Sequence, residues 1–406
     1  MNHARMQFAC QYYRLAVPLE GFEKAGLANT WCDTLDEGAD AAILGMTSSD
    51  FSLFWGTKGQ SVLDQFKILQ EMKASVDDDG EIHLPPVLIL DTDDNRDYVH
   101  PHNTVFVTDG VRAYPDTTLL SPGQTVWSPD GEGGKHVLWE DKKTYYGGNT
   151  FDIERNLHEM NITHRIQRLV DGMTTPSPQL AKYLKEVVGV KNVYVFPNTI
   201  IPEHYRSFPL IPHVGIRILW QGGSSHSIDW WPLRDAIKTI CLRNPSVIFV
   251  VFGNQEDWIK DYIPASQLEQ VGWVQYPAYR LQRALLQIDI NLAPLADNLF
   301  NRCKSAIKWY EASVWDKPEV TLASRVPPFS DEMTDNVNGL LYTTPEEFIE
   351  KLQLLIDSSD LRNRLALEAK EWVKKNRTPE VTIPPLWEFY EELQRQKRRK
   401  LVPLCQ

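Results

Sequence analysis

The stretch Ile216-Arg-Ile-Leu-Trp-Gln-Gly-Gly-Ser-Ser-His-Ser-Ile-Asp229 decides the fold class. It opens with an apolar run that predicts a buried strand over 216–220. Gly222 and Gly223 follow, and a helical pattern begins at Trp230. A strand that passes through a glycine loop into a helix is the repeating unit of a parallel α/β sheet.

The loop after this strand is predicted to bind an anion. Gly222 and Gly223 let the backbone approach a ligand closely. Ser224 and Ser225 can cap the helix or bind phosphate oxygens, and His226 can donate a hydrogen bond to an anion. Ligands of open α/β folds bind at the carboxyl ends of the strands, where this loop lies. An ordinary helix cap without a ligand is the alternative interpretation.

A second segment, Asn301-Arg-Cys-Lys-Ser-Ala-Ile-Lys-Trp-Tyr-Glu311, predicts a helix that begins near Lys304. Lys304, Lys308 and Glu311 then share one face, at positions i, i+4 and i+7. Two lysines in the first turns repel each other and the positive end of the helix dipole, and a bound anion would offset this repulsion. Ser305 belongs to the same predicted site, and Glu311 is placed to hold a sugar hydroxyl. A solvated helix end is the alternative.

Short apolar runs alternate with helical patterns along the chain, which indicates parallel α/β sheets. The predicted strands are 41–44, 87–90, 104–107, 193–196, 216–220, 247–252, 288–292 and 320–323. The predicted helices are 61–74, 153–169, 177–187, 230–242, 278–286, 305–314, 345–357 and 361–375. After the proline pair Pro384-Pro385, a final amphipathic helix is predicted.

The length of 406 residues predicts two domains. The segment 197–214 holds four prolines without clear periodicity, so it is interpreted as the linker. The predicted domains are residues 1–205 and 206–378, followed by a final helical segment over residues 379–406.

Composition excludes several classes of protein. A formal net charge of −12 disfavours nonspecific binding of nucleic acid. No apolar run is long enough to span a bilayer, and the first residues lack the apolar region of a signal peptide. Five cysteines without metal-type spacing suit a reducing compartment, so we expect a cytoplasmic protein. The sequence makes no prediction of oligomeric state.

An acidic segment follows the predicted strand 87–90. Asp91, Asp93 and Asp94 repel one another unless a cation, an arginine or a hydroxylated ligand lies near them. A divalent metal site, a role as general base and an Asp-rich turn paired with Arg96 are the three interpretations.

Other enzyme classes lack their motifs in this sequence. There is no Gly-x-Gly-x-x-Gly after a first strand and no Gly-Lys-Ser/Thr phosphate loop. There is also no Gly-x-Ser-x-Gly elbow of a serine hydrolase and no zinc-type spacing of Cys and His.

From residue 193 to 375 the sequence resembles retaining glycosyltransferases of the two-Rossmann (GT-B) type. This is the large family-four-like group that includes sucrose synthases and bacterial mannosyltransferases. The matching motifs, in order, are Val195-Phe-Pro-Asn198, Ile218-Leu-Trp-Gln-Gly-Gly223, Gly272-Trp-Val274, 285–294, 303–311, 318–324 and Asn338-Gly-Leu-Leu341. The N-terminal half resembles a phage or bacterial subgroup of this family, and the matching residues are Tyr13-Arg14, Pro18 and Asp91-Thr-Asp-Asp94.

The resemblance implies a GT-B fold whose C-terminal domain binds a nucleotide-diphosphate sugar. It also implies that the final helix, within residues 379–406, crosses back and packs on the N-terminal domain. Glu311 matches the second glutamate of the family's paired-glutamate motif, which binds the nucleotide ribose. The first glutamate falls at Cys303, where this chain departs from the family. Lys304 or Lys308 then contacts the diphosphate. No metal or other cofactor is expected, because lysines and a helix N-terminus can neutralise the leaving group.

The remaining roles follow the same resemblance. The acidic cluster stands where relatives have a histidine-containing loop that faces the acceptor. Tyr13 and Arg14 are predicted on the acceptor side. The predicted catalytic residues are Asp91, Asp93, Asp94 and His226.

The predicted reaction is transfer of a sugar to an acceptor hydroxyl of a glycan or other molecule, with retention of configuration. One alternative is a phage-type enzyme that glycosylates hydroxymethylated bases in DNA. Another is a binding protein for nucleotide sugars or glycans that has no catalytic activity.

Overall fold

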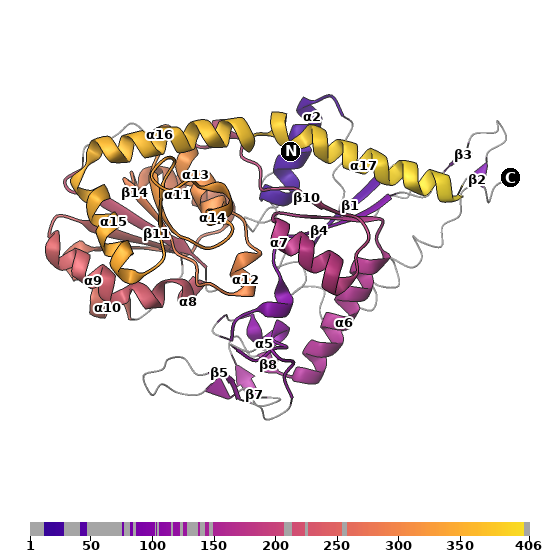
Figure 1. Ribbon diagram of the computed structural model, residues 1–406, viewed down its shortest axis with the longest axis horizontal. Helices are drawn as coiled ribbons and strands as arrows, with labels where there is room; N and C mark the ends of the chain where they lie inside the picture. Colours follow the sequence, from indigo (N-terminus) through magenta and orange to yellow (C-terminus); the bar gives the residue numbers. More distant parts are fainter. Residues whose placement is uncertain are drawn as a thin grey trace. The chain divides into compact units, whose positions relative to one another are not determined.

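The computed structural model describes residues 12–27, 41–46, 75–76, 82–83, 87–101, 103, 105–114, 117–121, 125–127, 137–138, 143–145, 149–206, 213–223, 226–253 and 258–401 (Figure 1). The chain divides into two compact units. The C-terminal unit is built mainly from residues 200–378. The N-terminal unit contains residues 10–99, 107–199 and 379–406. Each unit has its own parallel sheet, which confirms the predicted α/β fold class.

The described part of the N-terminal unit contains a four-stranded sheet in the order β1-β4-β9-β10. Its strands are β1 (Ala41–Met46), β4 (Val87–Thr92), β9 (Gly172–Thr175) and β10 (Val193–Val195), and all neighbours run parallel. Strand β4 is buried along its whole length, as its uninterrupted apolar sequence predicts. Three two-stranded ribbons complete the described strands: Ser75–Val76 with Ile82–His83, Thr125–Trp127 with Val137–Leu138, and Lys143–Tyr145 with Asn149–Phe151.

Two sets of helices pack against this sheet. One set is the π-helical turn Tyr12–Ala16, α2 (Val17–Lys24) and the final helix α17 (Pro379–Leu401). The other is α6 (Ile153–Leu169), α7 (Pro178–Tyr183) and the π-helical turn Leu184–Val188. Short helical turns lie at Arg96–Tyr98 and Phe106–Asp109.

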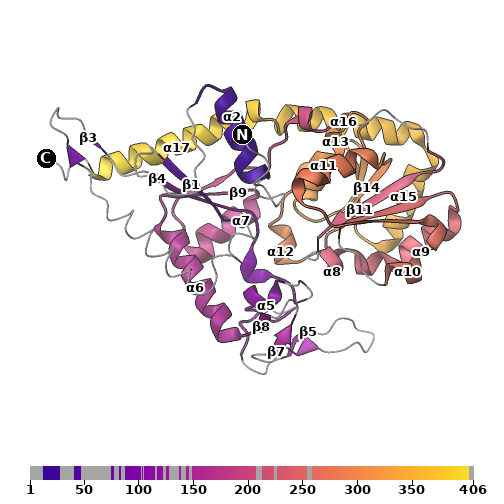
Figure 2. The same cartoon turned by 180° about the vertical axis from the view of Figure 1, so that it is seen from behind.

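Helix α17 belongs to the N-terminal unit and runs along β1, β4 and β9 (Figure 2). Its side chains Ile383, Leu386 and Leu393 pack in one apolar cluster with residues of α2 and β4. A side chain at Gly172 would approach Leu393 to 2.5 Å, so glycine allows this close contact between helix and strand. The chain thus returns to its first half after completing the second.

The C-terminal unit contains six described parallel strands in the order β13-β12-β11-β14-β15-β16. They are β11 (Arg217–Gly222), β12 (Ile248–Gly253), β13 (Leu268–Gly272), β14 (Ile290–Ala293), β15 (Val320–Ser324) and β16 (Leu340–Tyr342). Counted along the chain, this is the doubly wound order 3-2-1-4-5-6. The direction of winding changes between β11 and β14, where such folds bind their ligands.

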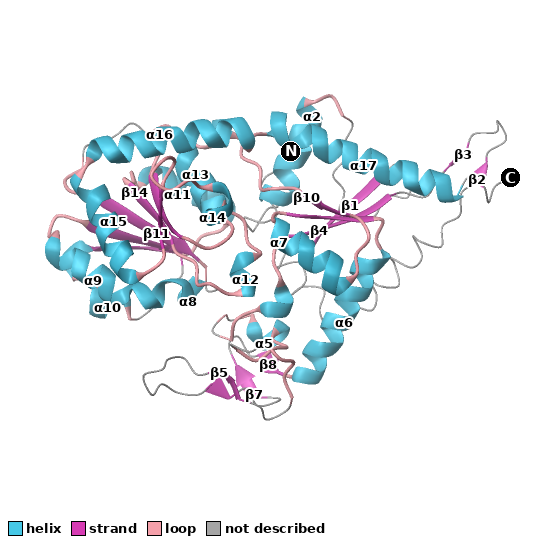
Figure 3. Cartoon of the chain, in the orientation of Figure 1, coloured by secondary structure: helices cyan, strands magenta, loops and turns pink. Residues whose placement is uncertain are grey.

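Helices cover both faces of this sheet (Figure 3). The helices of the unit are α8 (Ser227–Trp230), α9 (Arg234–Arg243), α10 (Ile259–Tyr262), α11 (Tyr276–Leu285), α12 (Leu299–Arg302), α13 (Ile307–Val314), α14 (Phe329–Glu332), α15 (Pro345–Asp357) and α16 (Ser359–Asn376). Single 3₁₀ turns lie at Pro202–His204, Trp231–Leu233 and Ala265–Gln267. Alternate residues of β11 face opposite cores: Ile218 and Trp220 pack with α9 and α15, and Leu219 packs near α11.

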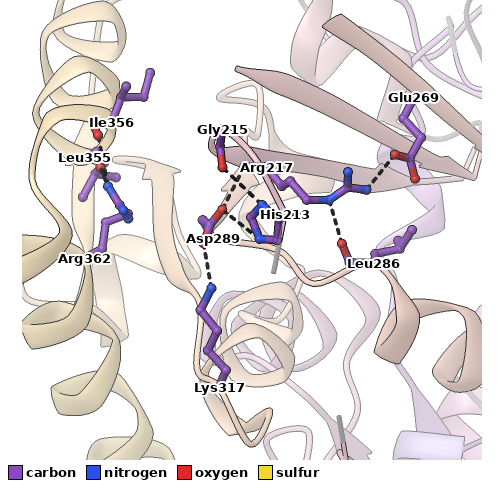
Figure 4. Close-up of polar contacts among 10 residues, drawn as sticks. All are labelled: His213, Gly215, Arg217, Glu269, Leu286, Asp289, Lys317, Leu355, Ile356 and Arg362. Carbon is purple, nitrogen blue, oxygen red and sulfur yellow. Dashed lines mark hydrogen bonds and ion pairs between the residues drawn. The ribbon is translucent and has the colours of Figure 1, made fainter. Parts of the chain in front are cut away.

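Asp289 ties together the amino ends of three strands, at the edge opposite the ligand-binding one (Figure 4). Its carboxylate accepts the Arg217 backbone N–H at 2.9 Å and the Lys317 ammonium at 2.7 Å. Arg217 in turn donates to the Leu286 carbonyl at 2.8 Å and to Glu269 at 2.7 Å. Because Arg217 begins β11 and Asp289 precedes β14, this network fixes the two central strands in register.

The structure departs from the predicted elements at several places. The predicted strand 104–107 is a helical turn over Phe106–Asp109. Strands β9, β13 and β16 were not predicted, because they are short and lack a strong apolar run. Helix α17 begins at Pro379 and continues through Pro384 and Pro385, so the predicted break there is wrong. The predicted helix 61–74 lies outside the described residues.

Among the described helices, none combines the length and the apolar character needed to cross a lipid bilayer.

Asp289→Ala is expected to lower the free energy of unfolding by about 2 kcal/mol, because the partly buried Arg217 N–H loses a charged acceptor. Urea denaturation measures this change. Asp297→Ala is the matched control, since Asp297 pairs with Arg302 on an exposed surface and should contribute under about 1 kcal/mol. Equal effects of the two substitutions would contradict the assigned role of Asp289.

Candidate functional site

The connection after β11 brings a glycine and a histidine into close contact. A side chain at Gly222 would meet the His226 ring at 3.0 Å, so the imidazole packs directly over this glycine. The Gly223 carbonyl accepts the His226 backbone N–H at 3.1 Å. Ser224 and Ser225 lie outside the described residues. The predicted loop therefore places an imidazole at the carboxyl end of β11.

Asp229 connects this loop to the segment that follows β14. Its Oδ2 accepts a hydrogen bond from Nδ1 of His226 at 2.6 Å. Its Oδ1 accepts the backbone N–H of Ala296 at 2.9 Å and the side-chain amide of Asn301 at 2.6 Å. The side chain of Asp229 is fully buried. The carboxylate thus spans the point where the order of the strands changes direction.

His226 is neutral near pH 7 in this arrangement. Burial and the positive charges of Lys308 and Lys304 lower its pKa to about 4, against the opposing effect of Asp229. Because a carboxylate only accepts, the ring hydrogen lies on Nδ1 and Nε2 carries a lone pair. The predicted donation from His226 to an anion therefore requires a second proton, which a bound anion would favour.

The helix that carries Lys308 begins later than predicted. The chain forms the short helix α12, a turn over residues 303–306, and then α13, whose first residue is Ile307. Lys304 and Ser305 therefore precede the helix, and Lys308 lies in its first turn. The N-cap residue is Ala306, which makes no side-chain hydrogen bond to the helix end. The Trp309 N–H donates to the Ala306 carbonyl at 2.9 Å, which leaves the N–H groups of Ile307 and Lys308 at this helix end for an anion.

Lys308 carries a buried ammonium group. Its Nζ is enclosed and has no hydrogen-bond partner among the described residues. Burial lowers the pKa of Lys308 to about 8, with Asp229 raising it and Lys304 lowering it further. The Asn291 side chain donates to the Lys308 backbone carbonyl at 3.3 Å, which helps fix this residue. An unpaired buried cation is unfavourable, and an anionic ligand would remove that penalty.

The turn before α13 supplies a second cation and a thiol. The ammonium of Lys304 lies 4.3 Å from the centre of the Phe300 ring. Cys303 is buried and forms no disulfide with the other described residues.

Glu311 lies one turn beyond Lys308 and is 7% exposed. It accepts a hydrogen bond from the Tyr279 hydroxyl at 3.2 Å. The same hydroxyl contacts Gln221 at 2.9 Å, and Arg283 contacts Gln221 at 3.3 Å. Gln221 belongs to the end of β11, so these bonds hold the Glu311 carboxylate beside the predicted ligand site.

Within the C-terminal unit, the structure therefore brings five of the predicted residues together: Gly222, His226, Lys304, Lys308 and Glu311. Two lysines and a helix N-terminus suit a diphosphate, and a carboxylate suits a hydroxyl donor. The sequence analysis assigned no role to Asp229, Asn301, Tyr279 or Gln221. The spacing of His226 and Asp229, three residues apart at a helix start, was the one available signal for this pair.

Asp91 and Arg14 form a buried ion pair in the N-terminal unit. Arg14 Nε donates to Asp91 Oδ1 at 2.9 Å, and Nη2 donates to Oδ2 at 2.5 Å. Thr174 also donates to Oδ2 at 2.5 Å, and Arg14 contacts the Phe196 carbonyl. Asp91 is 2% exposed and Arg14 and Tyr13 are each 3% exposed. These contacts are structural, so we do not carry Asp91, Arg14 or Tyr13 into the proposed reaction.

Asp93 and Asp94 follow the end of β4 and are both partly exposed. Among the described residues, no group of three His, Cys, Asp or Glu side chains is arranged to hold a metal ion. Of the three interpretations of the acidic segment, the pairing with arginine applies to Asp91, although its partner is Arg14 rather than Arg96.

We expect one lysine to titrate near pH 8, which NMR of ¹³C-methylated lysines detects and Lys308→Arg identifies by loss of that signal. Sulfate should raise this pKa, because a bound anion favours the charged ammonium. If every lysine titrates near the ordinary value of about 10.4, with or without sulfate, the ammonium of Lys308 is not held as described.

The sequence matches no protein-family model, and no curated protein matches it. Solved structures of similar fold exist. Sucrose-phosphate synthase from Thermosynechococcus elongatus is 10% identical, with a TM-score of 0.51, over 86% of this chain and 73% of that chain. TarM is 12% identical, with a TM-score of 0.51, over 87% of this chain and 55% of that chain. A mutant of S. aureus TarM, in complex with fondaparinux, α-GlcNAc-glycerol and UDP, is 12% identical, with a TM-score of 0.48, over 76% of this chain and 51% of that chain.

This chain therefore spans little more than half the length of TarM. At such low identity the similarity establishes the fold and not the activity. The structural neighbours are GT-B glycosyltransferases, and the chain has the GT-B fold.

Proposed function

We propose that the protein is a glycosyltransferase that moves a sugar from a nucleotide-diphosphate donor to an acceptor hydroxyl. One observation carries the proposal. The buried ammonium of Lys308 has no partner among the described residues, and it lies in the first turn of α13 beside the loop after β11. A diphosphate is the ligand that would satisfy this cation, the free N–H groups of the helix and the neighbouring Lys304 together.

The same groups suit the chemistry of transfer. Breaking the bond at the anomeric carbon develops negative charge on the leaving diphosphate. Lys308, Lys304 and the end of α13 would stabilise this charge more strongly than the charge of the bound donor, which accelerates the reaction. His226 would take up a proton as the diphosphate binds, because the phosphate charge raises the pKa of the imidazole from its low value.

Glu311 would bind the ribose of the donor. Its carboxylate accepts hydrogen bonds and is positioned by Tyr279. In the resembled family a second glutamate binds the sugar, and Cys303 stands in its place here. We propose that this chain holds the donor sugar by other contacts, and that the diphosphate and ribose provide most of the binding energy.

The N-terminal unit would bind the acceptor. Asp93 and Asp94 are the carboxylates of the acidic segment that would accept a hydrogen bond from an acceptor hydroxyl and orient it. We propose a carbohydrate acceptor in preference to hydroxymethylated DNA, since the net charge of −12 disfavours a nucleic-acid duplex. Duplex binding that weakens steeply with added salt would favour the DNA acceptor instead. We propose that transfer requires no metal ion and takes place in the cytoplasm.

Retention of configuration is part of the proposal. The acceptor oxygen would bond to the anomeric carbon on the face that the diphosphate leaves. The acceptor proton would pass to an oxygen of the leaving diphosphate, which Lys308 keeps close to that face. No separate base on the opposite face is then needed.

Lys308→Met should weaken binding of the donor by about ten- to hundredfold, because a charge-assisted hydrogen bond is lost. The free protein should become no less stable, since the substitution removes an unpaired buried charge. Thermal shifts with UDP-, GDP-, ADP- and TDP-sugars first identify the donor, and calorimetry then measures affinity. Lys375→Met, at an exposed position of α16, is the matched control. Glu311→Ala should also weaken binding, with Glu350→Ala as its control.

Three results would contradict the proposal. Failure of every nucleotide sugar to stabilise the protein would exclude the donor site. Unchanged affinity in Lys308→Met and Glu311→Ala would place that site elsewhere. If a donor binds but is neither hydrolysed nor transferred to any of a broad set of sugar acceptors, the protein would be a non-catalytic nucleotide-sugar-binding protein.

Product stereochemistry tests the remaining part of the proposal. With a donor of known anomeric configuration, proton NMR of the product should show the same configuration, because the acceptor attacks the face that the diphosphate leaves. Spectra recorded early in the reaction serve as the control for later anomerisation. A product of opposite configuration would require a base on the opposite face and would overturn the retaining mechanism.

A further inference from the structure

The N-terminal unit contains a polar pocket that lies outside the diphosphate site. It is enclosed by the segment that follows β4 and by helices α6 and α7, which lie beside the sheet in Figures 1 and 2. Its empty space is about 420 Å³, part of which is open to solvent. The lining side chains that bear on its chemistry are Asp94, Asp97, Thr163, His164, Gln167 and Tyr183.

Two side chains of α6 present unsatisfied polar atoms to this pocket. Thr163 and Gln167 are four residues apart and therefore lie on the same face of the helix. Thr163 Oγ1 and Gln167 Oε1 are buried and have no hydrogen-bond partner among the described residues. Gln167 as a whole is 7% exposed. Buried polar atoms without partners are rare and unfavourable, so a ligand that donates to Gln167 Oε1 would be stabilised here.

Another part of the lining is fixed by hydrogen bonds among three side chains. Asp97 Oδ2 accepts from His164 Nε2 at 2.7 Å and from the Tyr183 hydroxyl. Burial and the charge of Asp97 raise the pKa of Tyr183, which keeps its hydroxyl protonated as a donor. The Tyr98 ring packs edge-on against Tyr183 at 5.6 Å. These contacts fix the shape of this part of the pocket. Binding of a ligand would therefore cost the protein little conformational entropy.

The charges around the pocket are mixed. Asp94 and Asp97 line it together with Arg96, and Arg96 pairs with Asp109 at 3.3 Å. Two carboxylates disfavour a phosphorylated or carboxylated ligand. The apolar side chains of Leu180 and Leu184 form part of the lining and suit C–H groups. A neutral ring with hydroxyl groups at its edge and C–H groups on its face matches both features.

We propose that this pocket binds the acceptor as a neutral, hydroxyl-bearing sugar ring, with one hydroxyl donating to Gln167 Oε1. The inference that this sugar is the acceptor rests on the proposed glycosyltransferase function. Asp94 lines this pocket and also belongs to the acidic segment that we assign to acceptor binding. The pocket is therefore continuous with the proposed acceptor-binding segment. Because the Gln167 carboxamide oxygen would accept a hydrogen bond from one sugar hydroxyl, an analogue that lacks this hydroxyl should bind more weakly.

Saturation-transfer NMR on the full chain tests the proposal. The probes are the methyl glycosides of glucose, galactose, mannose and N-acetylglucosamine, each at up to about 50 mM. We expect at least one to bind the wild type, and Thr163→Val/Gln167→Met to weaken that binding by about tenfold. Asn161→Leu is the control, since Asn161 is exposed on the same helix and does not line the pocket. Far-UV circular dichroism verifies that each variant is folded.

Deoxy derivatives of the bound glycoside identify the hydroxyl that contacts Gln167. One derivative should bind the wild type about tenfold more weakly but bind Gln167→Met as well as the parent sugar does, because the contact is already lost. Absence of binding by all four glycosides, or equal binding by the wild type and the double variant, would overturn the proposal. Donor binding at Lys308 is measured separately. Its failure alongside glycoside binding would refute the proposed transferase and leave the sugar pocket intact.

Discussion

The candidate donor site depends on the buried carboxylate of Asp229. Strands β11 and β14 are neighbours, but the connections that follow them lead into different helices, as expected where the winding of a doubly wound sheet reverses. The two connections diverge at such a junction, which does not by itself fix their positions. Asp229 joins them, because its carboxylate accepts hydrogen bonds from His226 after β11 and from Ala296 and Asn301 after β14. Because all three partners are held by one buried side chain, the loop over Gly222 and the approach to α13 are positioned together.

This arrangement also explains the electrostatic character of the free protein. Lys308 is buried without a hydrogen-bonding partner among the described residues, and His226 is kept neutral beside it. Asp229 favours the charge on both groups, but burial outweighs this effect for each of them. The protein thus tolerates the unfavourable desolvation of a cation at this site. Preorganised charge of this kind acts on a ligand without further rearrangement, which is the usual physical basis for stabilising a developing negative charge.

Much of the fold could be predicted from the sequence, since local patterns determine it. Helices 153–169 and 345–357 were predicted with their observed bounds. The buried strands β4 and β12 contain uninterrupted apolar runs, and β11 contains a shorter one after Arg217. The start of α13 was not predicted correctly, because Lys304 and Ser305 are compatible with a helix. The turn before α13 depends on Asn301, whose side-chain amide donates to Asp229. That contact joins residues 72 positions apart, and the ion pair of Arg14 with Asp91 joins residues 77 apart. Contacts of such separation leave no periodic signal in one sequence.

The acidic segment shows how strand geometry divides neighbouring carboxylates between different roles. Successive side chains of β4 point to opposite faces of the sheet. Asp91 therefore shares a face with Ile89 and Val87, which pack with α2 and α17, and it meets Arg14 there. Thr92 points to the other face and lines the pocket of α6 and α7, together with Asp94 and Asp97 beyond the strand end. Asp91, one of the predicted catalytic residues, still belongs to the strand and is therefore enclosed in the core. Asp94 and Asp97, which line the pocket, come after the strand has ended, where the chain is free to turn toward it.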